Sequence, residues 1–170
     1  MKAIQDYYPE EFARCFGCGR LNENGYRWRT FPTGDTTETR YTPQPYHMAI
    51  PGFVNGGLLA SLVDCTATGT AAWAAYRAEN REMDTSPPHR FVTASLRVDY
   101  LRPTPLGPEL LVRGHVKSIS GRKVIIEVTV SAGGEVTVRG EVITVEVPES
   151  MRPPSAPRPP WPGRSTTAMK

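Results

Sequence analysis

A single carboxylate stands out in the middle of this chain. Asp64 is the only charged residue between Gly56 and Tyr76, a stretch that reads GGLLASLVDCTATGTAAWAAY. The length of this stretch, its content of Ala and Leu and its lack of proline favour a helix over a strand. The helix is apolar or small nearly all round, so we expect it to be buried on most sides. Because a buried charge is costly unless it has partners or a task, Asp64 is either a hydrogen-bonded structural residue or a catalytic one.

The residues that open the predicted helix favour the catalytic interpretation. Asn55 is a good N-cap residue, and it is followed by Gly56 and Gly57. The first N–H groups of a helix have no partner inside the helix and carry the positive end of its dipole. Glycines allow a substrate carbonyl to come close to those N–H groups. The pattern therefore predicts an oxyanion hole that acts together with Asp64.

Helix geometry places a constraint on how these two groups cooperate. Gly56 and Asp64 are about 12 Å apart along one helix. One carbonyl cannot lie within about 3 Å of both the N–H donor and the carboxylate. If both groups act on one substrate, they come from different subunits, which predicts a homodimer with two composite sites.

The elements around the helix read as strands joined by turns. A loop, PQPYHMAIPG, precedes the helix, and four alternating apolar and polar stretches follow it. Gly140 is a candidate bulge, because the apolar phase of the last stretch changes there. One long helix and a mostly antiparallel meander predict an α+β fold. The strand candidates are residues 26–31, 36–42, 92–100, 110–117, 124–130 and 136–147.

Length and charge limit the functional classes. A chain of 170 residues suggests one domain, which we place at residues 1–147. Residues 148–170 are rich in proline, so we expect a disordered or polyproline-like tail, solvated rather than a PxxP ligand. The net charge of +3 comes from this tail, and the balanced body argues against a nucleic-acid binder. With no apolar run of about eighteen residues and no signal-peptide core, we expect a cytoplasmic protein that binds no membrane.

The three cysteines and one histidine near the helix are weaker candidates. An odd number of cysteines in reducing surroundings argues against a disulfide framework. Cys15 and Cys18 form one CxxC, but zinc needs two more ligands, and no second CxxC or suitably spaced His pair exists. We therefore expect no metal and no other cofactor, and we assign Cys65 to core packing. His47, in the loop before the helix, either lines the pocket or is a plain loop histidine.

The segment YHMAIPGFVNGGLLASLVDC resembles the motif of PaaI-like hotdog thioesterases, which is PG-x-V-HGG, six residues, and then Asp. FVTASLRVDYLRPTPLGPELLVRGHV and the earlier CFGCG and NENG resemble other segments of that family, so the match covers roughly residues 15–147. The resemblance implies a hotdog fold, an antiparallel sheet of about five to six strands wrapped around one long central helix. It also implies dimers whose sheets join, and many members pair again into tetramers.

The resemblance also implies hydrolysis of an acyl-CoA and a role for each matching residue. Asp64 matches the carboxylate that acts as general base or nucleophile, and Gly56 matches the N–H that holds the thioester oxygen. Thr93 falls where relatives place a hydroxyl that helps to position the lytic water. Position 55 departs from the family, which usually has His there. Asn55 still caps the helix and can donate a hydrogen bond, but it cannot titrate near neutral pH.

Coenzyme A carries phosphates, so basic residues should surround the mouth of the pocket. Arg102, Arg122 and Lys123 are candidates for this role beside Gly57 and His47, although arginines near turns are common on any surface. A non-catalytic acyl-CoA-binding or regulatory module on the same fold is the alternative function. A hydratase-type hotdog protein is disfavoured because the Asp-His dyad of that chemistry is not evident. The acyl group, and the choice between coenzyme A and a carrier protein, are left open.

Overall fold

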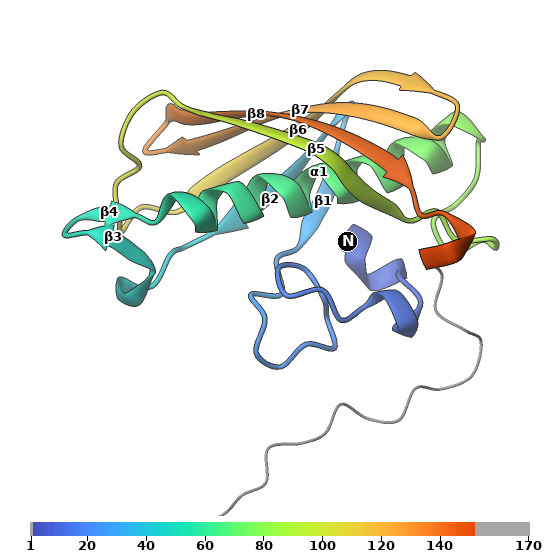
Figure 1. Ribbon diagram of the computed structural model, residues 1–170, viewed down its shortest axis with the longest axis horizontal. Helices are drawn as coiled ribbons and strands as arrows, with labels where there is room; N and C mark the ends of the chain where they lie inside the picture. Colours follow the sequence, from blue (N-terminus) through green and yellow to red (C-terminus); the bar gives the residue numbers. More distant parts are fainter. Residues whose placement is uncertain (1, 152–170) are drawn as a thin grey trace, which may run out of the picture.

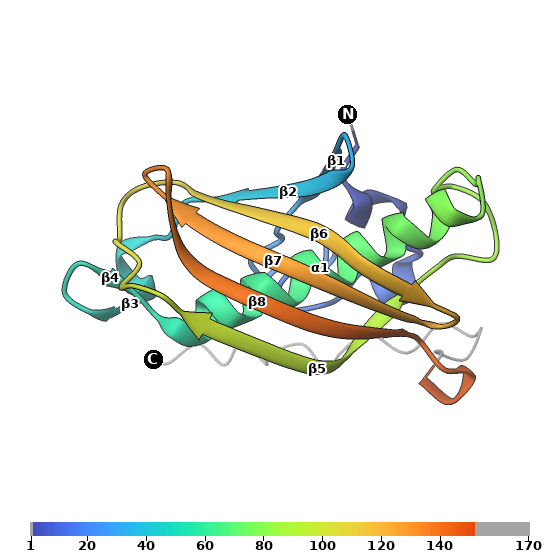
Figure 2. The same ribbon diagram turned by 90° about the horizontal axis from the view of Figure 1, so that it is seen from above.

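One long helix, α1 (Gly56–Ala78), lies across one face of a six-stranded antiparallel sheet in the computed structural model, which describes residues 2–151. Figure 1 shows the sheet curving over the helix, and Figure 2 shows the strands crossing it from above. This arrangement confirms the predicted α+β hotdog fold. The predicted proline-rich tail lies, from residue 152 onward, outside the described residues.

The sheet has the strand order β1-β2-β6-β7-β8-β5, so β1 and β5 form its two edges. All neighbouring pairs are antiparallel. A two-stranded hairpin, β3 (Met48–Ile50) and β4 (Phe53–Val54), precedes α1 where a loop was predicted. Short 3-10 helices are η1 (Ile4–Tyr7), η2 (Glu10–Phe12), η3 (Pro45–His47) and η4 (Glu149–Met151). The six strands are β1 (Thr30–Thr33), β2 (Thr36–Tyr41), β5 (Phe91–Tyr100), β6 (Leu110–Ser120), β7 (Lys123–Ala132) and β8 (Glu135–Glu146).

Gly140 does not form the predicted bulge. Close packing of the helix on the sheet explains why glycine occupies this position. Gly140 pairs in regular register with Val98 and Val128. A Cβ atom at this position would lie 2.5 Å from Cγ1 of Val63, which is fully buried on α1. Glycine is needed there because the helix approaches the strand, not because the strand bends. The bulge lies at Thr137 instead, since β7 and β8 change register between Val130/Ser131 and their partners Val138/Val136.

Buried hydroxyl groups join α1 to β1 and β2. The Thr30 and Thr39 hydroxyls are 2.8 Å apart, and Thr66 donates to Thr39 at 3.1 Å. The Thr37 and Thr70 hydroxyls are 2.6 Å apart. Each buried hydroxyl thus has a partner, as buried polar groups require, and the network fixes the rotation of the helix against this edge of the sheet.

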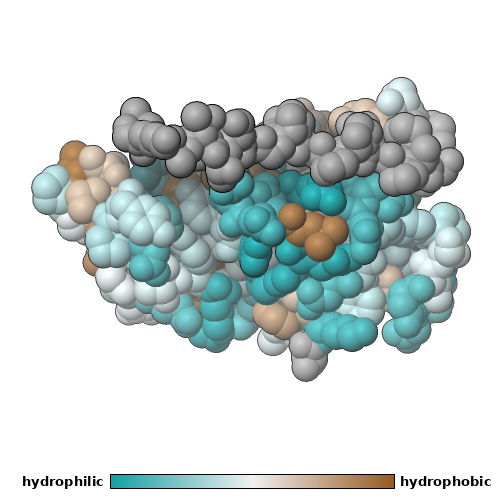
Figure 3. Space-filling model, turned by 90° about the horizontal axis from the view of Figure 1, so that it is seen from below, coloured by the Kyte–Doolittle hydropathy of each residue, from teal (hydrophilic) through white to brown (hydrophobic). Residues whose placement is uncertain are grey.

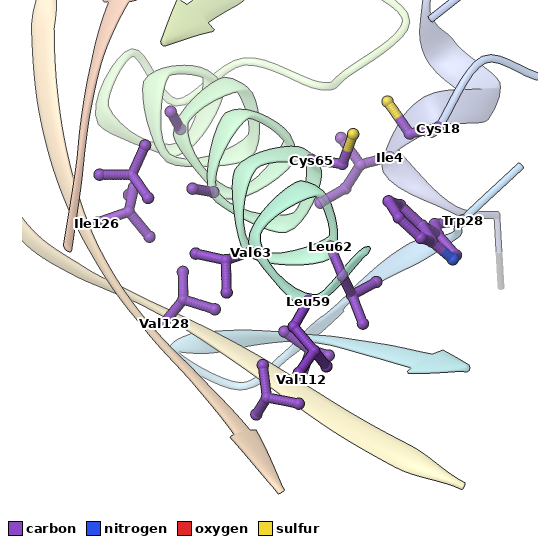
Figure 4. Packing of buried hydrophobic residues seen from close by; sticks show 14 of the residues in the cluster. Ile4, Cys18, Trp28, Leu59, Leu62, Val63, Cys65, Val112, Ile126 and Val128 are labelled. Atoms are coloured by element: carbon purple, nitrogen blue, oxygen red, sulfur yellow. The ribbon is translucent and has the colours of Figure 1, made fainter. Parts of the chain in front are cut away.

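Residues 2–29, the N-terminal covering segment, lie on the side of α1 that faces away from the sheet (Figure 1). Ile4, Tyr8, Cys18 and Trp28 are buried there and belong to the same core as the sheet residues. Figure 4 shows the division: Val63 points to the sheet, whereas Cys65 points to the N-terminal segment. Among residues 2–151, no helix is long and apolar enough to cross a membrane.

The first predicted strand, residues 26–31, was wrong in its first half. The strand begins at Thr30, because Arg27 has a φ of 55° that breaks the extended chain. The N–H groups of Tyr26 and Trp28 donate to Phe16 and Gly17 instead, each at 3.0 Å. Residues 26–28 therefore belong to the N-terminal covering segment.

Candidate active site

Asp64 lies in the middle of α1 and contacts the edge strand β5. The Thr93 hydroxyl donates a short hydrogen bond to Oδ1 of Asp64. Both side chains are partly buried. The structure thus brings together the two residues that the sequence placed in one site, although they are 29 positions apart in the chain.

A β-bulge in β5 directs Thr93 toward the helix. Thr93 pairs with Thr144, whereas Ser95 pairs with Ile143, so Ala94 is an extra residue in the ladder. Bulges reverse the alternation of side chains and re-aim them. For this reason Phe91, and not Val92 as the predicted alternation required, is the buried apolar residue at the start of this strand.

Burial sets the protonation of Asp64. Desolvation raises the pKa of its carboxyl above the ordinary value of 3.8, and the hydrogen bond from Thr93 opposes this rise. The negative charge of the Cys15 thiolate raises the pKa of Asp64 further, and the Arg90 guanidinium lowers it. A carboxyl with a raised pKa is a stronger base than an exposed one once it is ionised.

The start of α1 presents free N–H groups. Asn55 caps the helix by accepting a hydrogen bond from the Leu58 N–H at 3.1 Å. Among residues 2–151, the N–H groups of Gly56 and Gly57 find no acceptor. The Gly56 carbonyl accepts a hydrogen bond from the Tyr100 hydroxyl at 2.7 Å, a contact that the sequence did not predict and that ties the end of β5 to the first turn of the helix.

A cavity of about 300 Å³ lies beside the start of α1. This volume is at the lower end of the range for small-molecule sites. Three segments border the cavity: the N-terminal covering segment, η3 with the start of β3, and the first turns of α1. The lining residues are Phe16, Tyr26, Tyr46, His47, Met48, Asn55, Gly57, Leu58 and Ser61.

His47 lines this cavity and also holds the loop in front of the helix. Its Nδ1 accepts a hydrogen bond from the Gln44 N–H at 2.9 Å and lies 3.0 Å from the Tyr41 hydroxyl. Its carbonyl accepts the Asn55 N–H at 2.9 Å. Burial lowers the pKa of the His47 imidazole, so the neutral ring is favoured. His47, at the end of η3, thus borders the cavity and also holds the segment in front of the helix in place.

The predicted basic residues lie at two ends of the molecule. Arg102 follows β5 at the end where α1 begins, and its guanidinium forms an exposed ion pair with Glu135 at 2.6 Å. Arg122 and Lys123 lie at the β6–β7 turn, near the C-terminal end of α1 (Figure 2). Arg122 donates to the carbonyls of Glu146 and Val147 at the end of β8. Within one chain, therefore, only Arg102 lies near the start of the helix.

Three cysteines meet on the side of α1 that carries Asp64. The sulfur atoms of Cys15, Cys18 and Cys65 all lie within 4.8 Å of one another. Cys65 is buried in the core, as predicted, but its contact with the CxxC was missed because no local signal links residues so far apart in the chain. Hydrogen bonds from Cys18 and Cys65 hold the pKa of the Cys15 thiol well below its usual range.

Comparison with known proteins points to one family. The model of the thioesterase superfamily matches residues 51–144. The chain is 37% identical over 84 residues to the acyl-coenzyme A thioesterase THEM4 of Xenopus laevis, an alignment that covers 49% of this chain and 32% of the relative. The chain thus spans about a third of the length of this curated relative.

Solved structures share the fold. A thioesterase superfamily protein from Shewanella loihica PV-4 is 41% identical, with a TM-score of 0.62, and the match covers 75% of this chain and 96% of that one. The PaaI protein from the phenylacetic acid degradation operon of E. coli is 13% identical, with a TM-score of 0.55 over 67% of this chain and 74% of its own. At that identity, the second likeness concerns the fold alone.

We predict that Thr93→Val raises the pKa of Asp64 further. The Thr93 hydroxyl stabilises the ionised carboxylate, and its loss leaves desolvation unopposed. Carboxyl ¹³C NMR titration should give a midpoint above 3.8 in the wild type and a higher one in the variant. Ser95→Ala, which removes an exposed hydroxyl from the same strand, should leave the midpoint unchanged. A midpoint in Thr93→Val that is equal to or below that of the wild type would contradict the assignment.

Proposed function

The chain belongs to the thioesterase superfamily, and we propose that it hydrolyses an acyl-CoA thioester to a carboxylic acid and free coenzyme A. The family match confirms the predicted hotdog thioesterase family, and the E. coli PaaI protein shares the fold. Because the curated relatives are much longer than the aligned region, their activity transfers to this chain only as a proposal.

One observation carries the proposal. Asp64 is the single carboxylate on α1, it is partly desolvated, and a hydroxyl from β5 holds it. Oδ1 of Asp64 accepts the Thr93 hydroxyl, whereas Oδ2 has no donor among residues 2–151. A carboxylate with one fixed and one free oxygen is suited to act on a water molecule or on a carbonyl.

Two routes give the same balanced reaction. As a general base, Asp64 takes a proton from water while the water oxygen attacks the thioester carbonyl, and the C–S bond then breaks to release the coenzyme A thiolate, which takes the proton. As a nucleophile, Asp64 attacks the carbonyl itself and releases the thiolate, and water then cleaves the mixed anhydride. Both routes develop negative charge on the carbonyl oxygen, which the Gly56 N–H would stabilise.

Asn55 fits the oxyanion site despite its departure from the family. Its Oδ1 is used by the helix cap, so the side-chain Nδ2 keeps its donors for a substrate. That amide would add a second hydrogen bond to the thioester oxygen beside Gly56. An amide cannot exchange protons near neutral pH, so the position would contribute charge stabilisation and no acid-base chemistry.

The surface around the helix start suits an acyl-CoA. Aromatic, apolar and polar side chains together line the cavity beside it, and Figure 3 shows apolar side chains at the end of the molecule where β3 and β4 lie. Arg102, whose guanidinium pairs with Glu135, lies at this end and would bind a coenzyme A phosphate. The exposed large apolar residues there are Tyr46, Met48, Ile50, Phe53, Tyr100 and Leu101.

A homodimer would complete the site. β5 is an edge strand of ten residues whose outer side has no partner among residues 2–151. Pairing with the same strand of a second copy would join the two sheets and remove this exposed edge. Such a dimer could bring Asp64 of one chain toward Gly56 of the other, and Arg122 and Lys123 toward the partner's pocket. Pairing of two dimers and a cytoplasmic location remain predictions from the sequence.

We predict that wild-type protein turns over at least one member of a panel of acyl-CoAs and that Asp64→Asn abolishes this turnover. The substitution keeps the shape of the side chain and removes the base. Because the pKa of Asp64 is raised in the folded state, the ionised carboxylate costs stability as pH rises above the ordinary carboxyl range. The melting temperature of the variant at neutral pH should therefore equal or exceed that of the wild type.

The panel assay also separates the alternative function. Acyl-CoA binding without turnover by the wild type would favour a non-catalytic binding module. In the variant, residual turnover above about a tenth of wild type, a loss of only about 1.4 kcal/mol of transition-state stabilisation, would count against a catalytic Asp64.

We further predict that two inactive variants regain activity when their subunits exchange. Asp64→Asn lacks the carboxylate and Gly56→Pro lacks the N–H donor, so a heterodimer would hold one intact site and one site with both defects. Random exchange makes about half of the dimers hybrid, so recovery should approach about a quarter of wild-type activity.

Gly56→Ala is the matched control for this experiment. Alanine keeps the N–H group and adds a Cβ atom that would lie 3.3 Å from the Tyr100 hydroxyl, so it reports the steric effect alone. It should retain most of the activity that Gly56→Pro loses. If verified heterodimers stay inactive, the shared-site hypothesis is wrong and both groups act within one chain.

A further inference from the structure

The three cysteines of this protein form one compact group of sulfur atoms. The Cys15 and Cys65 sulfurs are 3.8 Å apart, although the residues are 50 positions apart in the chain. Four-coordinate zinc binds thiolate at about 2.3 Å, which places two sulfur ligands of one ion about 3.8 Å apart. The separation of the Cys15 and Cys65 sulfurs therefore matches that of two ligands on one metal ion, and the other sulfur pairs lie within 4.8 Å.

The loop that carries Cys15 and Cys18 is shaped around the third sulfur. A Cβ atom on Gly17 would lie 2.4 Å from the Cys65 sulfur, so only glycine allows the loop to pass so close. The Gly19 N–H donates to the Cys15 carbonyl at 2.9 Å and closes the loop on itself. Figure 4 shows the sulfur atoms of Cys18 and Cys65 facing one another across the gap between this loop and α1.

A buried positive charge lies beside the group. The Arg90 guanidinium lies over the Tyr8 ring, 4.0 Å from its centroid, and its Nη1 atom is buried without a hydrogen-bond partner. It is close enough to the cysteines for their thiolates to raise its pKa. Three thiolates and one divalent cation carry a net charge of about −1, which one guanidinium would neutralise. The buried Nη1 of Arg90, which has no hydrogen-bond partner, thus suits an anionic metal–thiolate centre better than three neutral thiols.

We propose that Cys15, Cys18 and Cys65 bind one soft divalent cation of the zinc class. Thiolates select such ions over magnesium or calcium. Among residues 2–151, no fourth His, Cys, Asp or Glu joins the group, so water or a small ligand takes the fourth position on the partly exposed side of Cys15. The prediction of no metal considered only the CxxC of Cys15 and Cys18. Cys65 supplies a third ligand from a distant part of the chain.

The ion would act on the architecture of the neighbouring cavity. Phe16 lies between the two loop cysteines and lines the cavity with Asn55 and Gly57. A metal ion would fix this loop to α1 at Cys65, one residue from Asp64. This role concerns the position of the cavity wall and does not depend on the reaction that the protein catalyses.

The test uses the full-length, reduced protein stripped of metal, with Co²⁺ and Zn²⁺ as probes. Co²⁺ should bind at one equivalent per chain and give thiolate-to-metal charge-transfer absorption, and Zn²⁺ should abolish that absorption and raise the melting temperature. Cys15→Ser, which alters the least buried ligand, should weaken Zn²⁺ binding at least tenfold and lose the rise in melting temperature. His115→Gln removes an exposed potential ligand elsewhere and should behave like the wild type.

Circular dichroism of each variant keeps the result interpretable, because a folded Cys15→Ser that binds Zn²⁺ as tightly as the wild type would overturn the proposal. So would reduced wild-type protein that binds less than about a tenth of an equivalent of Zn²⁺. If Cys15→Ser fails to fold, protection of the three wild-type thiols from a thiol reagent by Zn²⁺ decides the question. Thiols that react at the same rate with and without Zn²⁺ would refute the site.

Discussion

The partial burial of the only carboxylate on α1 is the constraint on which the site depends. Desolvation of Asp64 destabilises its ionised form, and the protein compensates with a single hydrogen bond from Thr93. That bond requires the bulge in β5. Without the extra residue Ala94, the alternation of the rest of the strand would place the Thr93 side chain on the face that points away from α1. The helix can carry this charge because its other faces are held by apolar packing on the sheet and by the threonine network.

The two sides of α1 have different tasks. The side toward the sheet is packed so tightly that Gly140 has no room for a Cβ atom beside Val63. The opposite side is covered by the N-terminal segment, whose loop meets Cys65 and lends Phe16 to the cavity wall. The position of the cavity therefore depends on how this loop is attached to the helix, which links the proposed metal site to the proposed active site through geometry alone.

The sequence predicted those features that local patterns encode. The stretch from Gly56 to Tyr76, whose one charged residue is Asp64, is indeed the helix, which continues to Ala78, and the alternating stretches are strands. Only the family resemblance placed Asp64 and Thr93 in one site, because neither spacing nor period links residues that are 29 positions apart. Contacts between distant segments were not predicted. No sequence pattern indicated that the Cys65 sulfur lies beside those of Cys15 and Cys18.

The remaining errors have local physical causes. Tyr26 and Trp28 were predicted to be strand residues, yet the positive φ of Arg27 and hydrogen bonds to the cysteine loop hold them outside the sheet.

The pH dependence of kcat/KM for acyl-CoA hydrolysis is the sharpest test of whether Asp64 is the reacting group, because it reports ionisation in the free enzyme. We expect an acid limb that coincides with the carboxyl pKa of Asp64 and that moves to higher pH in Thr93→Val. An acid limb that stays in place when the carboxyl pKa moves would show that Asp64 is not the group that reacts.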